Sequence, residues 1–242
     1  MGYSKVTERV SRMWFPGIDN NAFLISAGAD TTLVDVGPPK GLDLVTKALG
    51  KNGLRLPHVR HVVVTHCHTD HTGNLAAVAG PGPDGATATV YGHAADAGIV
   101  RDGAERPRGA ANRLMGRIML KMAKDSSRAD AAPVHVEVTD GLDIPAAGGM
   151  RCVHTPGHTA GHVSYLWPEG DVLFVGDAAT NMFRRLNVAP INEDDAATRA
   201  SFAKLAELRF AVACFGHGAP IRGRAVERFR KRLDHVARHA AR

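Results

Sequence analysis

His66-Cys67-His68-Thr69-Asp70-His71 is the most informative stretch of this chain, because it offers four metal-binding side chains within six residues. It follows His61-Val62-Val63-Val64-Thr65, an apolar run that predicts a buried strand. If the chain stays extended from Val62 to His66, the twofold period of a strand places His66 and His68 on one side, where both can bind one ion. Asp70 and His71 then fall where the next helix begins and face a second ion. Imidazole and carboxylate groups at this density indicate a metal site.

Three later segments each place one more metal-binding side chain after a predicted strand. They are Thr155-Pro156-Gly157-His158-Thr159-Ala160-Gly161-His162, Val172-Leu173-Phe174-Val175-Gly176-Asp177 and Ala213-Cys214-Phe215-Gly216-His217-Gly218. Ligand sites of layered α/β folds gather at the carboxyl ends of the strands. We therefore expect four strand ends to converge on one site.

These motifs resemble those of the metallo-β-lactamase superfamily of dinuclear metallohydrolases. The resemblance extends from Asn21-Ala22-Phe23-Leu24-Ile25 and Leu33-Val34-Asp35-Val36-Gly37 to Gly216-His217-Gly218. It implies one metal bound by His66, His68 and His158, and a second bound by Asp70, His71 and His217. Asp177 would bridge the two metals, and Asp35 would hold the ligands by hydrogen bonds from behind. His162 is expected to support the cluster and not to ligate.

The composition bounds the fold and the compartment. At 242 residues and 44% apolar content, the chain is long enough for a layered core and fits one domain, residues 1–242. Its three cysteines have no paired spacing, which is typical of a reducing compartment. We find no leader peptide and no apolar run of membrane length, so we expect a cytoplasmic protein without membrane contact. The net charge of +6 attracts polyanions in general, and we expect no nucleic-acid partner.

The order of the predicted elements favours an α/β fold, a four-layer αββα sandwich. Strands are predicted at residues 9–15, 22–27, 31–36, 62–65, 87–92, 134–138, 150–154, 163–167, 172–175 and 211–215. Helices are predicted at residues 42–49, 75–79, 196–208 and 224–239. Gly17, Asp19 and Asn20 are predicted to form a turn.

Residues 96–127 read as a helical insertion between the two halves, and its stretch from Arg113 to Lys124 is two-faced. Arg113, Arg117, Lys121 and Lys124 lie on one face, opposite Leu114, Met115, Ile118, Met119 and Met122. One interpretation is a helix packed on the sandwich, or on a twin subunit in a homodimer. The other is a lid whose Met115 and Met119 line a pocket for an apolar acyl group.

A site of this kind indicates hydrolysis. Two zinc ions would lower the pKa of a shared water and supply hydroxide, which attacks a carbonyl held by the first metal. Asp70 would then act as the catalytic group that manages the proton of the leaving group. Iron or manganese remain open as the metals, because all the ligands are nitrogen or oxygen. No Ser-His-Asp set or nucleophile elbow competes with this interpretation.

The substrate is predicted to be small and to carry an ester, lactone or thioester bond. The segment Asn181 to Asn187 follows the bridging aspartate and should edge the cleft, which makes Thr180, Phe183, Arg184 and Arg185 candidate substrate contacts. The arginines would favour a carboxylate or phosphate, and the methionine face an apolar tail. The alternative interpretation is an ordinary loop.

Differences between this sequence and individual branches of the superfamily narrow the range of expected activities. Exported β-lactamases usually lack a bridging aspartate such as Asp177. Glyoxalase II enzymes append a helical region, whereas this chain ends at Arg242 after His217. Homoserine-lactone hydrolases carry a tyrosine where this chain has Thr180, and the nucleases carry large insertions. A persulfide dioxygenase with one iron, a phosphodiesterase or nuclease, and a catalytically idle binding protein remain the alternatives.

Overall fold

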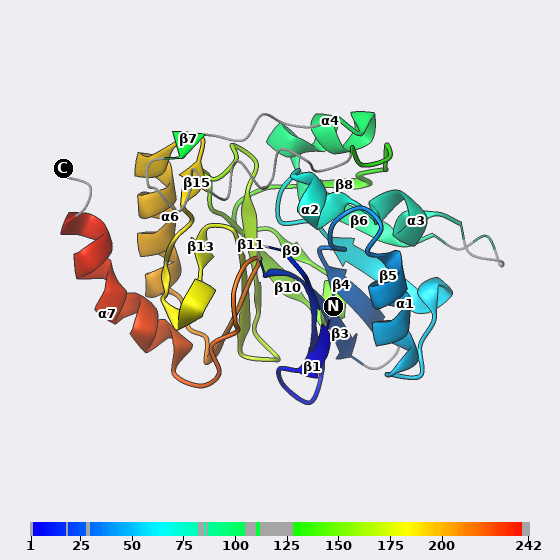
Figure 1. Cartoon of the computed structure of the whole chain (residues 1–242), viewed down its shortest axis with the longest axis horizontal. Coiled ribbons are helices and arrows are strands. Elements are labelled where there is room, and N and C mark those ends of the chain that lie inside the picture. The colour runs from blue at the N-terminus through cyan, green and yellow to red at the C-terminus, as the bar shows by residue number, and fades with distance from the viewer. Residues whose placement is uncertain are drawn as a thin grey trace.

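The computed structural model describes residues 2–17, 19–27, 30–81, 85, 87–104, 110–111 and 128–238. Two β-sheets lie at the centre, and helices flank them on both sides (Figure 1). Helices α1 (Leu42–Gly50) and α3 (Leu75–Ala79) lie on the right in that view, and α6 (Asp195–Glu207) and α7 (Ala225–Arg238) on the left. This arrangement confirms the predicted four-layer αββα sandwich.

The first sheet has seven strands in the order β1-β2-β3-β4-β5-β6-β8. Its strands are β1 (Gly2–Lys5), β2 (Val10–Phe15), β3 (Asn20–Ala27), β4 (Asp30–Val34), β5 (Val59–Val63), β6 (Thr89–His93) and β8 (Val136–Val138). The strands from β1 to β4 pair antiparallel, and those from β4 to β8 pair parallel. The parallel strands therefore end at one edge, which is where the loop after β5 emerges.

The second sheet has the order β16-β12-β11-β10-β9. It contains β9 (Asp143–Ile144), β10 (Met150–His154), β11 (Val163–Trp167), β12 (Val172–Gly176) and β16 (Val212–Phe215). Two short pairs complete the strands: β13 (Ala179–Thr180) with β14 (Asn187–Val188), and β15 (Ile191–Asn192) with β7 (Ala110–Ala111). The other helices in the described part of the chain are α2 (Thr69–Thr72), α4 (Ala94–Asp102) and the short 3-10 helices η1 (Leu56–His58), η2 (Ala146–Gly148) and η3 (Met182–Arg184).

Alternating side chains build three apolar layers between these four structural layers. On the first sheet, Leu33 packs outward with Val45 and Leu49 of α1, while its neighbour Val34 packs inward. The layer between the sheets includes Tyr165, Trp167 and Phe174 of the second sheet. The third layer joins the outer face of that sheet to α6 and α7, and it includes Leu173, Phe202 and Phe229. The period of two in the strands thus fixes which residues face which layer.

Several predicted boundaries shift. Strand β5 ends at Val63, so the regular strand does not continue to His66 as the sequence suggested. The helix predicted from Asp96 ends at Asp102, where Gly103 adopts a left-handed backbone with φ +59. The rest of the predicted helical insertion, with Met115 and Met119, lies outside the described residues. The assignment of residues 1–242 to a single domain stays a prediction. Among the described residues, no helix is both long and apolar enough to cross a membrane.

Candidate metal centre

The seven predicted ligands meet at the edge where β5, β10, β12 and β16 end, and all seven are buried. The loop after β5 brings His66 and His68, and Asp70 and His71 lie on α2 immediately after it. His158 follows β10, whereas Asp177 and His217 follow β12 and β16. The sequence expectation that four strand ends converge is therefore met.

The side chains form two groups of three that could each hold an ion. One group is His66, His68 and His158, and the other is Asp70, His71 and His217. A further combination, His66, His71 and Asp177, spans both groups, and within each combination the ligand atoms lie within 4.8 Å of one another. Asp177 Oδ2 lies 3.5 Å from His158 Nε2 and 3.2 Å from His217 Nε2. Asp177 thus stands between the two groups, as a bridging ligand would.

Asp35 fixes the orientation of two histidines. Its Oδ2 accepts a hydrogen bond from His71 Nδ1 at 2.8 Å and another from Thr65 Oγ1 at 2.8 Å. The Thr65 hydroxyl in turn lies 3.0 Å from His66 Nδ1 and can accept a hydrogen bond from it. Both imidazoles then direct Nε2 to the cluster, the nitrogen that would bind a metal.

Different groups hold the ligands from the second half. His158 Nδ1 donates to the carbonyl of Ile191 at 2.7 Å, which leaves Nε2 directed to the cluster. His162 Nε2 accepts from the backbone N–H of Asp177 at 2.8 Å, and its Nδ1 lies 2.8 Å from Thr155 Oγ1. Burial, followed by repulsion from His158, lowers the pKa of His162 to about 3, so it stays a neutral acceptor. With both ring nitrogens engaged, His162 supports Asp177 and is not placed to ligate.

Two residues contact the site that the sequence did not single out for it. Asp96, at the start of α4, accepts hydrogen bonds from Cys67 N (3.0 Å), Thr159 Oγ1 (2.7 Å) and Gly161 N (3.0 Å). It therefore ties the loop of His66 and His68 to the loop of His158. Asn20, predicted to lie in a turn, begins β3, and its Nδ2 lies 3.4 Å from Asp70 Oδ2. Nothing in the local sequence around either residue signals these contacts.

The electrostatics of the cluster fit a cation. Burial, together with repulsion from neighbouring histidines, lowers the pKa of His66 well below its ordinary value. Burial alone would raise the pKa of Asp177, but His217 and His71 lower it, so the carboxylate stays charged. His66 Nε2 and Asp177 Oδ1 are buried and have no hydrogen-bond partner among the described residues. Such atoms are costly to bury unless a ligand satisfies them, and nitrogen and carboxylate oxygen are metal donors.

The predicted substrate contacts lie beside the cluster, not within it. Thr180 is buried in β13, whereas Phe183, Arg184 and Arg185 are exposed, with Phe183 at 78%. Arg184 and Arg185 line two cavities to which none of the predicted metal ligands contributes. Contact of these residues with a substrate stays a prediction.

Comparison with known proteins gives matches over most of the chain. Residues 16–217 match the family model described as the metallo-beta-lactamase superfamily. The chain is 24% identical to "Beta-lactamase-like protein 2 homolog" of Caenorhabditis elegans over 89% of this chain and 61% of that protein. It is 26% identical to "Thioesterase pkgB" of Emericella nidulans over 83% of this chain and 46% of that protein. The chain thus spans between about two fifths and three fifths of the first curated relatives it matches.

Solved structures show the same fold. A metallo-beta-lactamase family protein from Thermus thermophilus aligns with a TM-score of 0.70 at 21% identity, covering 98% of this chain and 81% of that one.

Proposed function

The chain belongs to the metallo-β-lactamase superfamily, and from that premise we propose that it is a hydrolase that uses two metal ions to cleave an ester, lactone or thioester bond of a small substrate. The observation that carries the proposal is the pair of three-residue groups with Asp177 between them. His66, His68 and His158 would hold one ion, and Asp70, His71 and His217 the other.

The chemistry divides between the metals and the protein. When bound, two divalent cations lower the pKa of water and supply hydroxide near neutral pH. His162 and Asp35 hold the ligands in orientation, and neither needs to move during the reaction. The Asp70 side chain is the more solvent-accessible of the two carboxylates in the cluster, with 11% exposure against 5% for Asp177. We assign Asp70 the task of holding the proton that the leaving group receives, because its carboxylate is the more exposed of the two.

Zinc is the metal we propose, because five of the seven expected ligands are imidazoles, a donor type that zinc binds. Cys67 lies between two ligands in the sequence but is buried in the outer apolar layer with residues such as Val62 and Leu75. We also propose that the protein acts in the cytoplasm, since its three cysteines are free thiols.

A thioester is the substrate class we put first. The relative from Emericella nidulans is named as a thioesterase and shares 26% identity with this chain. In addition, Thr180 stands where the lactone-hydrolysing branch carries tyrosine, which makes a lactone the weaker candidate within the proposal.

The test is metal content measured together with turnover. Purified protein should contain about two zinc ions per chain and should hydrolyse acyl thioesters in a panel that also holds lactones and aryl esters. A chelator should abolish that activity, and zinc should restore it. No metal-dependent turnover across the panel would contradict the proposal, and so would one iron per chain with oxygen consumption, the signature of a dioxygenase.

A further inference from the structure

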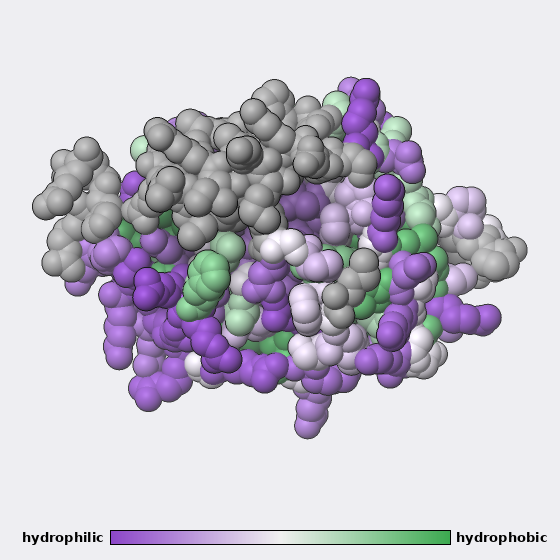
Figure 2. Space-filling model, viewed as in Figure 1, coloured by the Kyte–Doolittle hydropathy of each residue, from purple (hydrophilic) through white to green (hydrophobic). Residues whose placement is uncertain are grey.

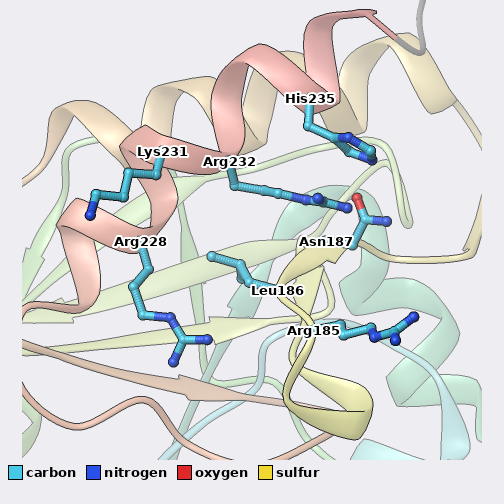
Figure 3. Close-up of a pocket in the computed structure, with 7 residues that line it drawn as sticks. All are labelled: Arg185, Leu186, Asn187, Arg228, Lys231, Arg232 and His235. Atoms are coloured by element: carbon cyan, nitrogen blue, oxygen red, sulfur yellow. The ribbon is translucent and has the colours of Figure 1, made fainter.

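A cationic cavity lies between α7 and strand β14, apart from the metal centre (Figure 3). Its volume is about 720 Å³, within the range of small-ligand pockets. Seven residues line it: Arg185, Leu186, Asn187, Arg228, Lys231, Arg232 and His235. Four carry a permanent positive charge, a fifth is histidine, and none carries a carboxylate. No predicted metal ligand belongs to this set.

One wall of the cavity is a stripe along α7. Arg228, Lys231, Arg232 and His235 follow the spacing i, i+3, i+4 and i+7, which places them on one face of a helix. Like charges at these spacings repel each other and weaken a helix. Glu227 is already paired with Arg224 at 2.9 Å. The stripe thus gathers three permanent positive charges and a histidine on one face of α7, at the wall of the cavity.

Packing on the opposite face of α7 holds this stripe in place. Phe229 is fully buried and stacks on Phe202 of α6, with ring centroids 4.9 Å apart. Val236 is buried in the same apolar layer. The rotation of α7 about its axis is therefore fixed, and the basic stripe is presented before any ligand arrives.

The second wall is the hairpin that follows Asp177. Arg185 is exposed after η3, Leu186 is buried, and Asn187 pairs with Thr180 across β13 and β14. Neither Arg185 nor Arg228 makes an ion pair with any of the residues that the structure describes. In Figure 3 the side chains of Arg232 and His235 extend from α7 toward Asn187.

The positive surface continues beyond this cavity. A neighbouring cavity of about 390 Å³ shares Arg228 and adds Arg184 and Arg222. Hydrophilic side chains cover the same side of the molecule in the region of α7 (Figure 2). The positive side chains thus extend over a longer stretch of surface than one monovalent anion could contact.

We propose that the cavity between α7 and β14 binds the polyphosphate chain of a nucleotide. Guanidinium groups bind phosphate oxygens in pairs and also stack on planar rings, so one set of arginines can serve both the phosphates and the base. Asn187, which is only partly buried, offers an amide for hydrogen bonds. The concave shape favours a small ligand over an extended nucleic-acid strand, which would need an open track. This inference does not depend on the proposed hydrolase activity.

Binding of ADP to the metal-loaded protein, measured by titration calorimetry, tests the proposal, with inorganic pyrophosphate and AMP as comparisons. ADP and pyrophosphate should bind, and AMP should bind more weakly because it has one phosphate. Arg228→Glu should weaken ADP binding at least about tenfold, since it reverses a charge in the centre of the site. Arg60→Glu is the matched control, because Arg60 is exposed on β5 and lines neither cavity. It should leave the affinity unchanged.

Two further variants show whether binding depends on the cavity itself. Arg185→Glu, in the hairpin that forms the other wall, should also reduce ADP binding. A folding defect of α7 alone cannot explain the loss of affinity in both Arg228→Glu and Arg185→Glu. Asp177→Ala should leave ADP binding intact, because the metal centre does not line the cavity. Wild-type ADP affinity in Arg228→Glu would overturn the proposal, and so would ADP binding that is lost with Asp177→Ala. Binding of a single-stranded RNA without binding of ADP would also overturn it.

Discussion

The two halves of the sandwich supply the metal centre in different ways. The first half places four proposed ligands within six residues after β5, whereas the second half places one ligand after each of three elements. Asp35 secures the first set directly or through Thr65, while His162 and Asp96 secure the second. In the first half, chain connectivity keeps the ligands together. In the second half the tertiary fold must do so, and each ligand depends on contacts remote in sequence.

The largest effect should come from Asp177→Ala, which removes the carboxylate between the two groups. Both groups lose a shared negative charge: His158 loses the carboxylate that lies 3.5 Å from its Nε2, and His217 keeps the carboxylate of Asp70, at 3.3 Å. Metal content should fall, and turnover should fall by more than about 100-fold, the upper end of the effect of losing a group that only supports a ligand. Metal analysis with steady-state kinetics checks this. Retention of two metals per chain would show that Asp177 is not needed to hold the metal pair.

Asp35→Asn tests the support within the first half. Asp35 accepts three hydrogen bonds, at Oδ2 from His71 Nδ1 and Thr65 Oγ1 and at Oδ1 from Thr65 N, so the amide NH₂ must oppose at least one of these donors and the support of His71 is weakened. We expect a 10- to 100-fold loss of metal affinity, roughly the effect of removing a group that holds a ligand. Competition with a chromogenic chelator measures it. An unchanged affinity would mean that connectivity alone positions these ligands.

Asp96→Asn tests the tie between the halves. Asp96 accepts three hydrogen bonds from the two ligand loops, and an amide NH₂ must oppose at least one of these donors. Leaving a buried donor unsatisfied costs about 1–3 kcal/mol. The free energy of unfolding of the metal-free protein, from urea denaturation, should fall by that amount. Asp43→Asn, at an exposed position on α1, is the control and should change it little.

The same contrast explains what the sequence could predict. The cluster from His66 to His71 is visible because the residues are adjacent, and the αββα layers follow from the order of apolar strands such as β12 and two-faced helices such as α7. Asp96 and Asn20 were missed, because their roles arise from hydrogen bonds to loops far along the chain. The strand boundary at Val63 was missed for a related reason: Asp35 Oδ1 takes the Thr65 N–H that a longer strand would have used in its ladder.

Cys67→Ser tests whether a residue that lies between two ligands in the sequence contributes to metal binding. Cys67 lies between two ligands, but its side chain is buried in the outer apolar layer, away from the cluster. Metal content should stay close to that of the wild type, and stability should fall by about 1 kcal/mol because a hydroxyl replaces sulfur in an apolar environment. Metal analysis and thermal unfolding test both parts. A loss of metal equal to that of Asp177→Ala would mean that the ligands are misassigned.

The smallest effect on stability is expected from loss of the ion pair between Lys204 and Asp140, at the base of the His158 loop. Lys204 donates to Asp140 Oδ1 at 2.7 Å and to the carbonyl of His154 at 2.9 Å. Burial alone would raise the pKa of Asp140, but its hydrogen bonds with Lys204 and the His154 N–H lower it. A lowered carboxyl pKa stabilises the fold above the unfolded-state value of about 3.9, and that contribution is lost as pH falls through the folded-state value.

Lys204→Met should therefore cost less than about 1 kcal/mol at pH 7, since solvent screens this ion pair, whose side chains are 39% and 55% exposed. The difference from wild type should shrink when urea unfolding is repeated below the unfolded-state value of about 3.9, because the contribution of the lowered Asp140 pKa is lost as pH falls further. A difference that grows toward low pH would contradict this sign. A cost well above 1 kcal/mol at pH 7 would instead show that the second half depends on surface ion pairs as strongly as on the buried hydrogen bonds of Asp96. Buried tertiary contacts would then no longer distinguish the second half from the first, whose ligands are held together by chain connectivity.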